Sequence, residues 1–166
     1  MESFVQVDHE EPVQASLPQQ ALWFSVHTLL GLAAWGALML AGYIIQPWGF
    51  PQTLILLLSI VVPLCAGFIV NKFRQDEMAT LVWLVGLTWI LIIALWILDM
   101  PTGPNACFQC DATEKLSRTF FSLPSPSGLI DDDGPFIGTW PAAALFGYAV
   151  GARLAMRREK DRTGTV

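Results

Sequence analysis

The sequence predicts an all-α membrane protein, a four-helix transmembrane bundle with an extracytoplasmic loop between helices 3 and 4. Long apolar blocks fill most of the 166-residue chain, and only 14% of its residues are charged, where a soluble domain carries about 25%. The blocks show no alternation of polar and apolar residues, so they are not strands of a membrane barrel. A helix satisfies its own backbone amides and needs about 20 apolar residues to cross a bilayer. Each block is therefore predicted to be one helical span.

Four blocks meet this requirement, at about 22–45, 53–70, 79–98 and 136–156, within a transmembrane domain over residues 21–156. The fourth block is rich in Gly and Ala and carries Arg153. Pro63 interrupts the second block and should bend that helix, because proline lacks a backbone N–H donor. Tryptophans near the predicted span ends form the aromatic belt typical of membrane interfaces, and they are Trp23, Trp48, Trp83, Trp96 and Trp140.

The basic residues predict the orientation of the spans. Seven of them lie between spans two and three or at the end of span four, and they are Lys72, Arg74, Arg153, Arg157, Arg158, Lys160 and Arg162. Only Lys115 and Arg118 lie in the loop after span three. The positive-inside rule then places both termini in the cytoplasm, and the expected location is a bacterial cytoplasmic membrane. We expect a disordered acidic tail at 1–20, which lacks the basic start of a signal peptide, and a basic tail at 157–166.

Two predicted helices carry small residues at four-residue spacing, which places them on one face. In the fourth span they are Ala143, Gly147, Gly151 and Ala155, and in the first span they are Ala33, Ala37 and Ala41. Small residues let two membrane helices approach until their backbones touch. We expect spans one and four to pack against each other within the chain. The alternative is that one of these faces binds a partner membrane subunit or a second copy of the chain.

His27 is the histidine inside an apolar block, where ionisable groups are costly and often functional. It is a candidate ligand for a metal porphyrin or chlorin, or a candidate proton relay. The other histidine, His9, lies in the leading tail, so one chain does not supply two intramembrane haem ligands. We therefore favour a histidine that is hydrogen-bonded within the packing or that snorkels to the membrane interface, and expect no cofactor and no resident metal.

The outer loop, predicted over 101–135, contains two cysteines separated by two residues, Cys107 and Cys110. Such thiols can close a small disulfide in the oxidising compartment expected for this loop. A c-type haem attachment would need a histidine directly after Cys110, where Asp111 stands, and a zinc site would need further ligands. A structural disulfide is the preferred interpretation, and a redox-active pair is the alternative. The third thiol, Cys65, is expected to be an inert apolar side chain.

A short helix is predicted after the cysteines. Asp111 and Glu114 form a helix start signal, and Leu116, Phe120 and Phe121 would share one apolar face. We expect this helix to lie on the outer membrane surface with its phenylalanines in the headgroup region.

These features favour a non-enzymatic accessory, assembly or scaffold subunit of a membrane complex, with the lipid bilayer as its solvent. The net charge of −5 and the short basic run beside a membrane span give no nucleic-acid-binding surface. Two alternatives stay open. One is a membrane thiol–disulfide oxidoreductase that uses Cys107 and Cys110, and the other is a small-solute transporter or channel that works as an oligomer.

Overall fold

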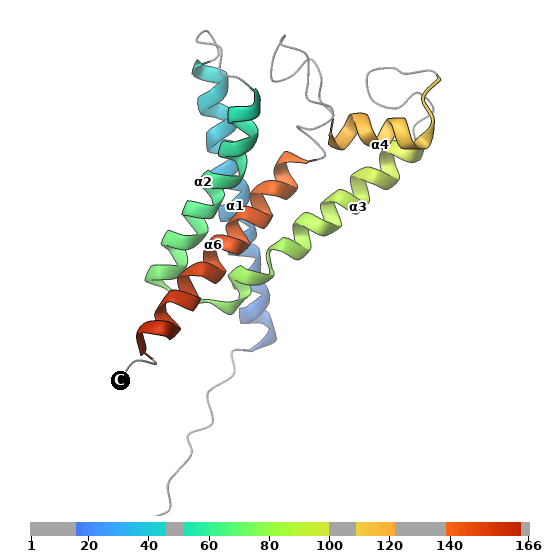
Figure 1. The fold of residues 1–166 in the computed structure, drawn as a ribbon. Coiled ribbons are helices and arrows are strands. Elements are labelled where there is room, and N and C mark those ends of the chain that lie inside the picture. The colour runs from blue at the N-terminus through green and yellow to red at the C-terminus, as the bar shows by residue number, and fades with distance from the viewer. Residues whose placement is uncertain (1–15, 46–51, 100–108, 122–138, 164–166) are drawn as a thin grey trace, which may run out of the picture.

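The computed structural model describes residues 16–45, 52–99, 109–121 and 139–163, and all regular structure in these ranges is helical (Figure 1). The elements are α1 (Leu17–Ile45), α2 (Gln52–Phe73), the 3-10 helix η2 (Glu77–Leu81), α3 (Trp83–Asp99), α4 (Ala112–Phe120) and α6 (Trp140–Thr163). Two helical stretches in these ranges, Leu17–Ala41 and Glu77–Asp99, are long and apolar enough to cross a membrane. A shorter apolar stretch, Leu57–Phe73, lies in α2.

The helices begin and end close to the predicted spans, but α1 and α6 are longer than expected. α1 begins at Leu17, inside the segment predicted to be a disordered tail, because Pro18 is tolerated in the first turn of a helix. α6 continues through the segment predicted as a basic tail and ends at Thr163. Arg, Glu and Lys are good helix formers, so the helix does not stop where the apolar residues stop.

α6 is the central element of the fold, because it contacts α1, α2, η2 and α3. The starts of α1 and α3 lie at the same end of the molecule as the ends of α2 and α6 (Figure 1). This end is referred to below as the basic end, since α2 and α6 carry basic residues there. A small apolar core joins η2 to α6, and its buried residues are Ala79, Val82, Leu145, Tyr148 and Ala152.

Glycines bring α2 and α6 into backbone contact. A Cβ atom at Gly147 would lie 2.5 Å from the carbonyl oxygen of Ile60, and one at Gly151 would collide with the carbonyl oxygen of Leu64. Gly67 on α2 faces the backbone of α6 in the same way. The small-residue face of α6 therefore packs on α2 through Gly147 and Gly151. α1 and α6 also contact each other, as expected, but through other residues. The missing side chains of Gly147 and Gly151 on α6 and of Gly67 on α2 leave the room that this backbone contact needs.

α1 contacts α6 through a different residue from those predicted. A Cβ atom at Gly31 would lie 3.3 Å from the Cδ2 atom of Leu145, so the absence of a side chain at Gly31 lets the two helices meet. Ala33, Ala37 and Ala41 are all exposed. The small-residue face predicted on the first span thus points away from the rest of the described chain.

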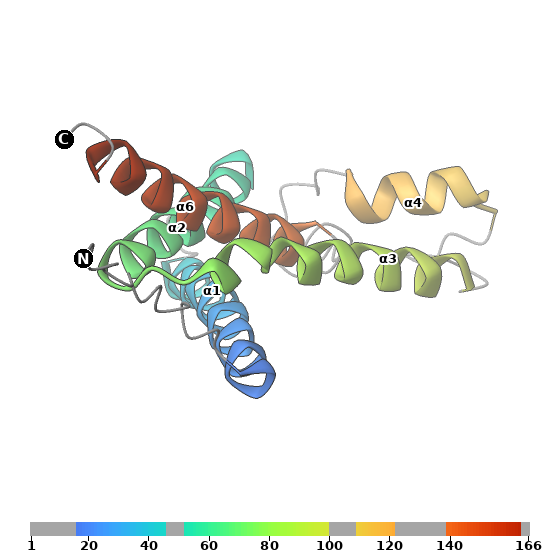
Figure 2. The ribbon, with the colours of Figure 1, turned by 90° about the horizontal axis from the view of Figure 1, so that it is seen from below.

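α3 diverges from α6 in Figure 1, and α4 lies beside the last part of α3, as Figures 1 and 2 show. The prediction of a helix after Asp111 is confirmed, because the Asp111 side chain accepts a hydrogen bond of 2.7 Å from the backbone N–H of Glu114. The hydroxyl of Thr139 donates to the carbonyl oxygen of Phe120 at 2.5 Å. This bond joins the end of α4 to the residue that precedes α6.

Candidate functional site

Four polar residues from separate parts of the chain meet toward the basic end of the bundle. They are His27 on α1, Asn71 near the end of α2, Asp76 before η2 and Tyr148 on α6, and together they form the polar cluster. Each of His27, Asn71 and Tyr148 is at most 2% exposed, and the side chain of Asp76 is 15% exposed. Since buried polar groups are costly without partners, the contacts within this cluster decide whether the helices can pack here.

The centre of the polar cluster is a hydrogen bond between α1 and α6. The Nδ1 atom of His27 lies 2.8 Å from the hydroxyl oxygen of Tyr148, and both side chains are buried. Gly31 lies one turn further along α1 and has no side chain to hold α1 away from Tyr148. The close approach at Gly31 therefore brings the imidazole within reach of the phenol.

Asp76 approaches the second ring nitrogen of His27. Its Oδ2 atom lies 3.5 Å from the Nε2 atom of His27. At this distance a protonated imidazole and the carboxylate of Asp76 would attract each other. Nε2 has no hydrogen-bond partner within the described part of the chain. The Oδ1 atom of Asp76 accepts a hydrogen bond of 2.9 Å from the backbone N–H of Met78 and so caps η2. One carboxylate thus serves a helix start and faces a buried histidine.

Asn71 fastens the connection between α2 and η2 to α6. Its Oδ1 atom accepts a hydrogen bond of 2.9 Å from the backbone N–H of Asp76. Its Nδ2 atom donates to the carbonyl oxygen of Ala152 at 3.2 Å. Both ends of one buried amide are therefore used to position the carboxylate that faces His27.

An aromatic and a basic residue extend the polar cluster toward the connection after α2. The guanidinium carbon of Arg74 lies 3.5 Å from the centre of the Trp23 ring, which is a cation–π geometry. The centre of the Trp23 ring lies 6.4 Å from the centre of the His27 ring. Arg74 and Trp23 therefore join the start of α1 to the end of α2 beside the buried imidazole.

The arrangement places an imidazole between a phenol and a carboxylate. Such a chain can pass a proton, because histidine accepts and donates protons near neutral pH. A protonated His27 would pair with Asp76. In this structure, however, the phenol and the imidazole are enclosed by helices, and the polar atoms join one element to another. The geometry therefore fits a polar clamp between helices better than an open reaction centre.

The predicted site residues are placed as follows. His27 is buried and hydrogen-bonded, with both ring nitrogens facing protein side chains. Cys65 is a free thiol on the exposed side of α2. Cys110 lies directly before α4, but Cys107 falls outside the described residues, so their disulfide stays a prediction. Across residues 16–45, 52–99, 109–121 and 139–163, no group of three His, Cys, Asp or Glu side chains gathers to hold a metal ion.

Three members of the polar cluster, namely Asn71, Asp76 and Tyr148, do not follow from the sequence pattern as site residues. Asn71 follows the second apolar block directly and Asp76 lies five residues later, which is one signal, because Asn and Asp side chains commonly bond to backbone groups in turns and at helix starts. Nothing in the spacing indicates Tyr148, since its partner lies on the first helix.

The described chain is a helical protein in which two helical stretches are long enough to cross a membrane. Buried polar groups join α1 and α2 to α6 at one end of the bundle. No protein-family model, curated protein or solved structure matches this chain.

Proposed function

We propose that this chain is a multi-pass integral membrane protein that serves as a non-enzymatic accessory, assembly or scaffold subunit of a membrane complex. In this proposal α1, α2, α3 and α6 are the four spans, both termini lie in the cytoplasm, and the membrane is the bacterial cytoplasmic membrane. The alternation of helix direction supports it, because the basic residues of α2 and α6 lie at one end of the bundle (Figure 1).

The outer surface of the helices supports a lipid environment. Large apolar side chains point outward on α1 (Leu22, Leu29, Leu40), on α2 (Leu57, Val61, Ile69) and on α3 (Leu91, Ile92, Leu95, Trp96). In water, each exposed square ångström of such surface would cost about 25 cal/mol relative to burial. Contiguous apolar surface on several helices is what a protein needs in a bilayer.

The observation that carries the subunit proposal is the open small-residue face of α1. Ala33, Ala37 and Ala41 are exposed, and a Cβ atom at Gly36 would have no atom within 4 Å. Gly31 on the same helix is already packed against α6. α1 thus has one small-residue contact filled by its own chain and a second that is open. We propose that a helix of a partner subunit or of a second copy fills it.

The buried polar side chains support a scaffold rather than an enzyme. The hydrogen bond of His27 joins α1 to α6, and the two hydrogen bonds of Asn71 join α2 to η2 and α6. A scaffold needs its helices held at fixed positions, and the polar cluster holds α1, α2 and α6 together. It lies toward the basic end of the bundle, where a membrane protein can tolerate charged groups.

Purification in mild detergent followed by native mass spectrometry tests the subunit proposal. The wild-type chain should carry a partner or a second copy, and Ala37→Leu should release it because leucine fills the open face. Ala112→Leu, at another exposed alanine on α4, is the matched control and should retain the complex. A lone wild-type monomer would contradict the subunit proposal. The melting temperature of each variant distinguishes lost binding from lost folding.

Cysteine labelling tests the orientation. In a chain whose three native cysteines are replaced by serine, Gln75→Cys places a thiol in the exposed connection after α2, and Ala112→Cys places one on exposed α4. An impermeant maleimide should label Ala112→Cys in intact cells and Gln75→Cys only after cell rupture. The reverse pattern would show that the termini lie outside.

A further inference from the structure

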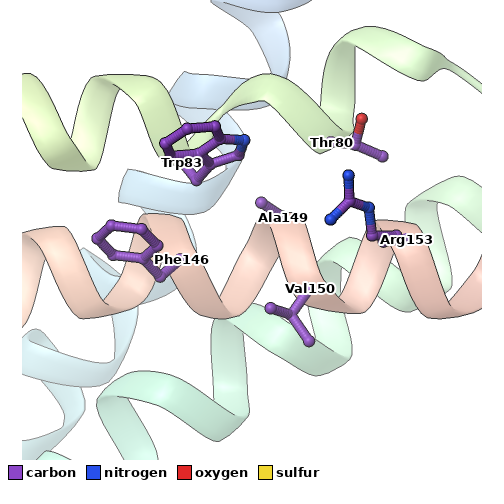
Figure 3. A pocket seen from close by; sticks show the side chains of 6 residues that line it. All are labelled: Thr80, Trp83, Phe146, Ala149, Val150 and Arg153. Atoms are coloured by element: carbon purple, nitrogen blue, oxygen red, sulfur yellow. The ribbon is translucent and has the colours of Figure 1, made fainter.

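A pocket separate from the polar cluster opens between η2, the start of α3 and α6 (Figure 3). Its volume is about 190 Å³, and its lining residues are Thr80, Trp83, Phe146, Ala149, Val150 and Arg153. We propose that this pocket binds one anionic phospholipid. The phosphate would lie at Arg153, and the glycerol and first acyl carbons would lie along Phe146 and Val150. This inference rests on the proposed membrane location of the helices.

The polar side of the pocket offers two unused donors. The guanidinium of Arg153 extends toward η2, and the indole nitrogen of Trp83 lies on the side of its ring that faces Arg153 (Figure 3). Neither side chain has a hydrogen-bond or ion-pair partner among the described residues. The hydroxyl of Thr80 already donates to the carbonyl oxygen of Glu77 at 2.8 Å. A guanidinium donates a planar pair of N–H groups, which matches two oxygens of a phosphate.

The other side of the pocket is apolar. The rings of Trp83 and Phe146 are stacked, with centres 6.4 Å apart and planes at 26°. Val150 is 49% exposed on the next turn of α6. Phe146 precedes Arg153 by seven residues, which is about 10 Å along a helix at 1.5 Å per residue. The pocket therefore changes from charged to apolar along α6 over a length that fits a phosphate followed by its glycerol and upper acyl chain.

The surrounding charges favour an anionic headgroup over a zwitterionic one. Arg157 follows one turn after Arg153 and is exposed. Glu77 is an exposed acid at the start of η2, and it forms no ion pair with Arg153. A headgroup with its own ammonium would place that cation beside these guanidinium groups. A headgroup with only the phosphate charge avoids this repulsion.

The position of the pocket agrees with the proposed orientation. It lies toward the basic end of the bundle, where Trp83 begins α3. Tryptophan prefers the level of the headgroups, and basic side chains near the cytoplasmic leaflet attract anionic lipid. In the proposed topology, Arg153 thus meets the phosphates of the cytoplasmic leaflet while Phe146 lies at the level of the acyl chains.

Lipid retention by the full-length protein tests this inference. Phosphatidylglycerol is the probe, titrated into protein purified in detergent and measured by native mass spectrometry against phosphatidylcholine. Arg153→Gln should weaken phosphatidylglycerol binding about tenfold, which corresponds to one hydrogen-bonded charge pair. Arg158→Gln, which removes the same charge outside the pocket, should leave it unchanged. Trp83→Phe keeps the ring and removes the N–H, so it should cause a smaller loss.

Three results separate the possible failures. Equal retention by Arg153→Gln and Arg158→Gln would overturn the assignment of the pocket, and Arg153→Lys should keep part of the affinity if the variant is folded. Displacement of the lipid by inorganic phosphate at the same concentration would show an anion site and overturn the lipid assignment. Recovery of the wild-type chain without detergent would instead overturn the proposed membrane location, which the pocket test alone does not address.

Discussion

The Nδ1 atom of His27 lies 2.8 Å from the hydroxyl of Tyr148, although 121 positions of sequence separate the two residues. This hydrogen bond joins α1 to α6 at a point where both side chains are buried. Because water does not reach these atoms, the two polar groups satisfy each other. The bond thereby specifies which faces of α1 and α6 meet, a choice that apolar surfaces alone leave open.

Tyr148→Phe should lower the free energy of unfolding by about 0.5–1.5 kcal/mol, because it leaves the Nδ1 atom of buried His27 without its hydrogen bond. Thermal unfolding in detergent measures this change. Thr88→Val is the matched control, since the hydroxyl of Thr88 is exposed and bonds only within its own helix, to the carbonyl oxygen of Leu84. Equal effects of the two substitutions would contradict a structural role for the bond.

Gly151→Ala should destabilise the protein by about 1–3 kcal/mol, because its Cβ atom would collide with the carbonyl oxygen of Leu64 and force α2 away from α6. Gly36→Ala is the control on α1, where a Cβ atom meets open space. That substitution should be neutral or stabilise by up to about 1 kcal/mol, since alanine favours helix over glycine. Unfolding of both variants in one detergent gives the comparison, and a harmless Gly151→Ala would refute the backbone contact.

Asn71→Leu should loosen the connection between α2 and η2. It removes the acceptor for the backbone N–H of Asp76 and the donor to the carbonyl oxygen of Ala152 at similar side-chain volume. We expect faster cleavage by a protease within residues 74–76 and a loss of about 1–3 kcal/mol of stability. Gln75→Ala changes an exposed amide in the same connection and should leave cleavage unaltered. Unchanged protection in Asn71→Leu would argue against the clamp.

The Cys107–Cys110 disulfide is expected to be structural. If the denatured protein is alkylated before reduction, only Cys65 should be modified. If it is alkylated after reduction, all three thiols should be modified, and mass spectrometry distinguishes the two results. Titration in redox buffers should give a reduction potential below about −300 mV. A potential near those of disulfide exchange enzymes, at about −120 to −270 mV, would instead favour the redox-active alternative.

The helical nature of the chain was predictable because each apolar block is long enough to form one helix, and the local signal at Asp111 falls at a helix start. The lengths of α1 and α6 were not predictable, because both helices extend beyond their apolar blocks. The small-residue face of α6 was also recognisable, because its spacing is regular. The helix on which this face packs, α2, was not recognisable from the sequence, because Gly67 on α2 belongs to no repeated pattern.

By itself, the sequence determined that the described chain is helical, where its polar breaks fall and that His27 lies within an apolar block. All of these depend on neighbours within a few positions, so they can be read from composition and spacing. Tertiary structure alone decided that α6 packs on α2, that Gly31 rather than the alanines of α1 contacts α6, and that His27 faces Tyr148. Those outcomes depend on how the helices cross, and crossing is determined by steric fit between surfaces far apart in the chain.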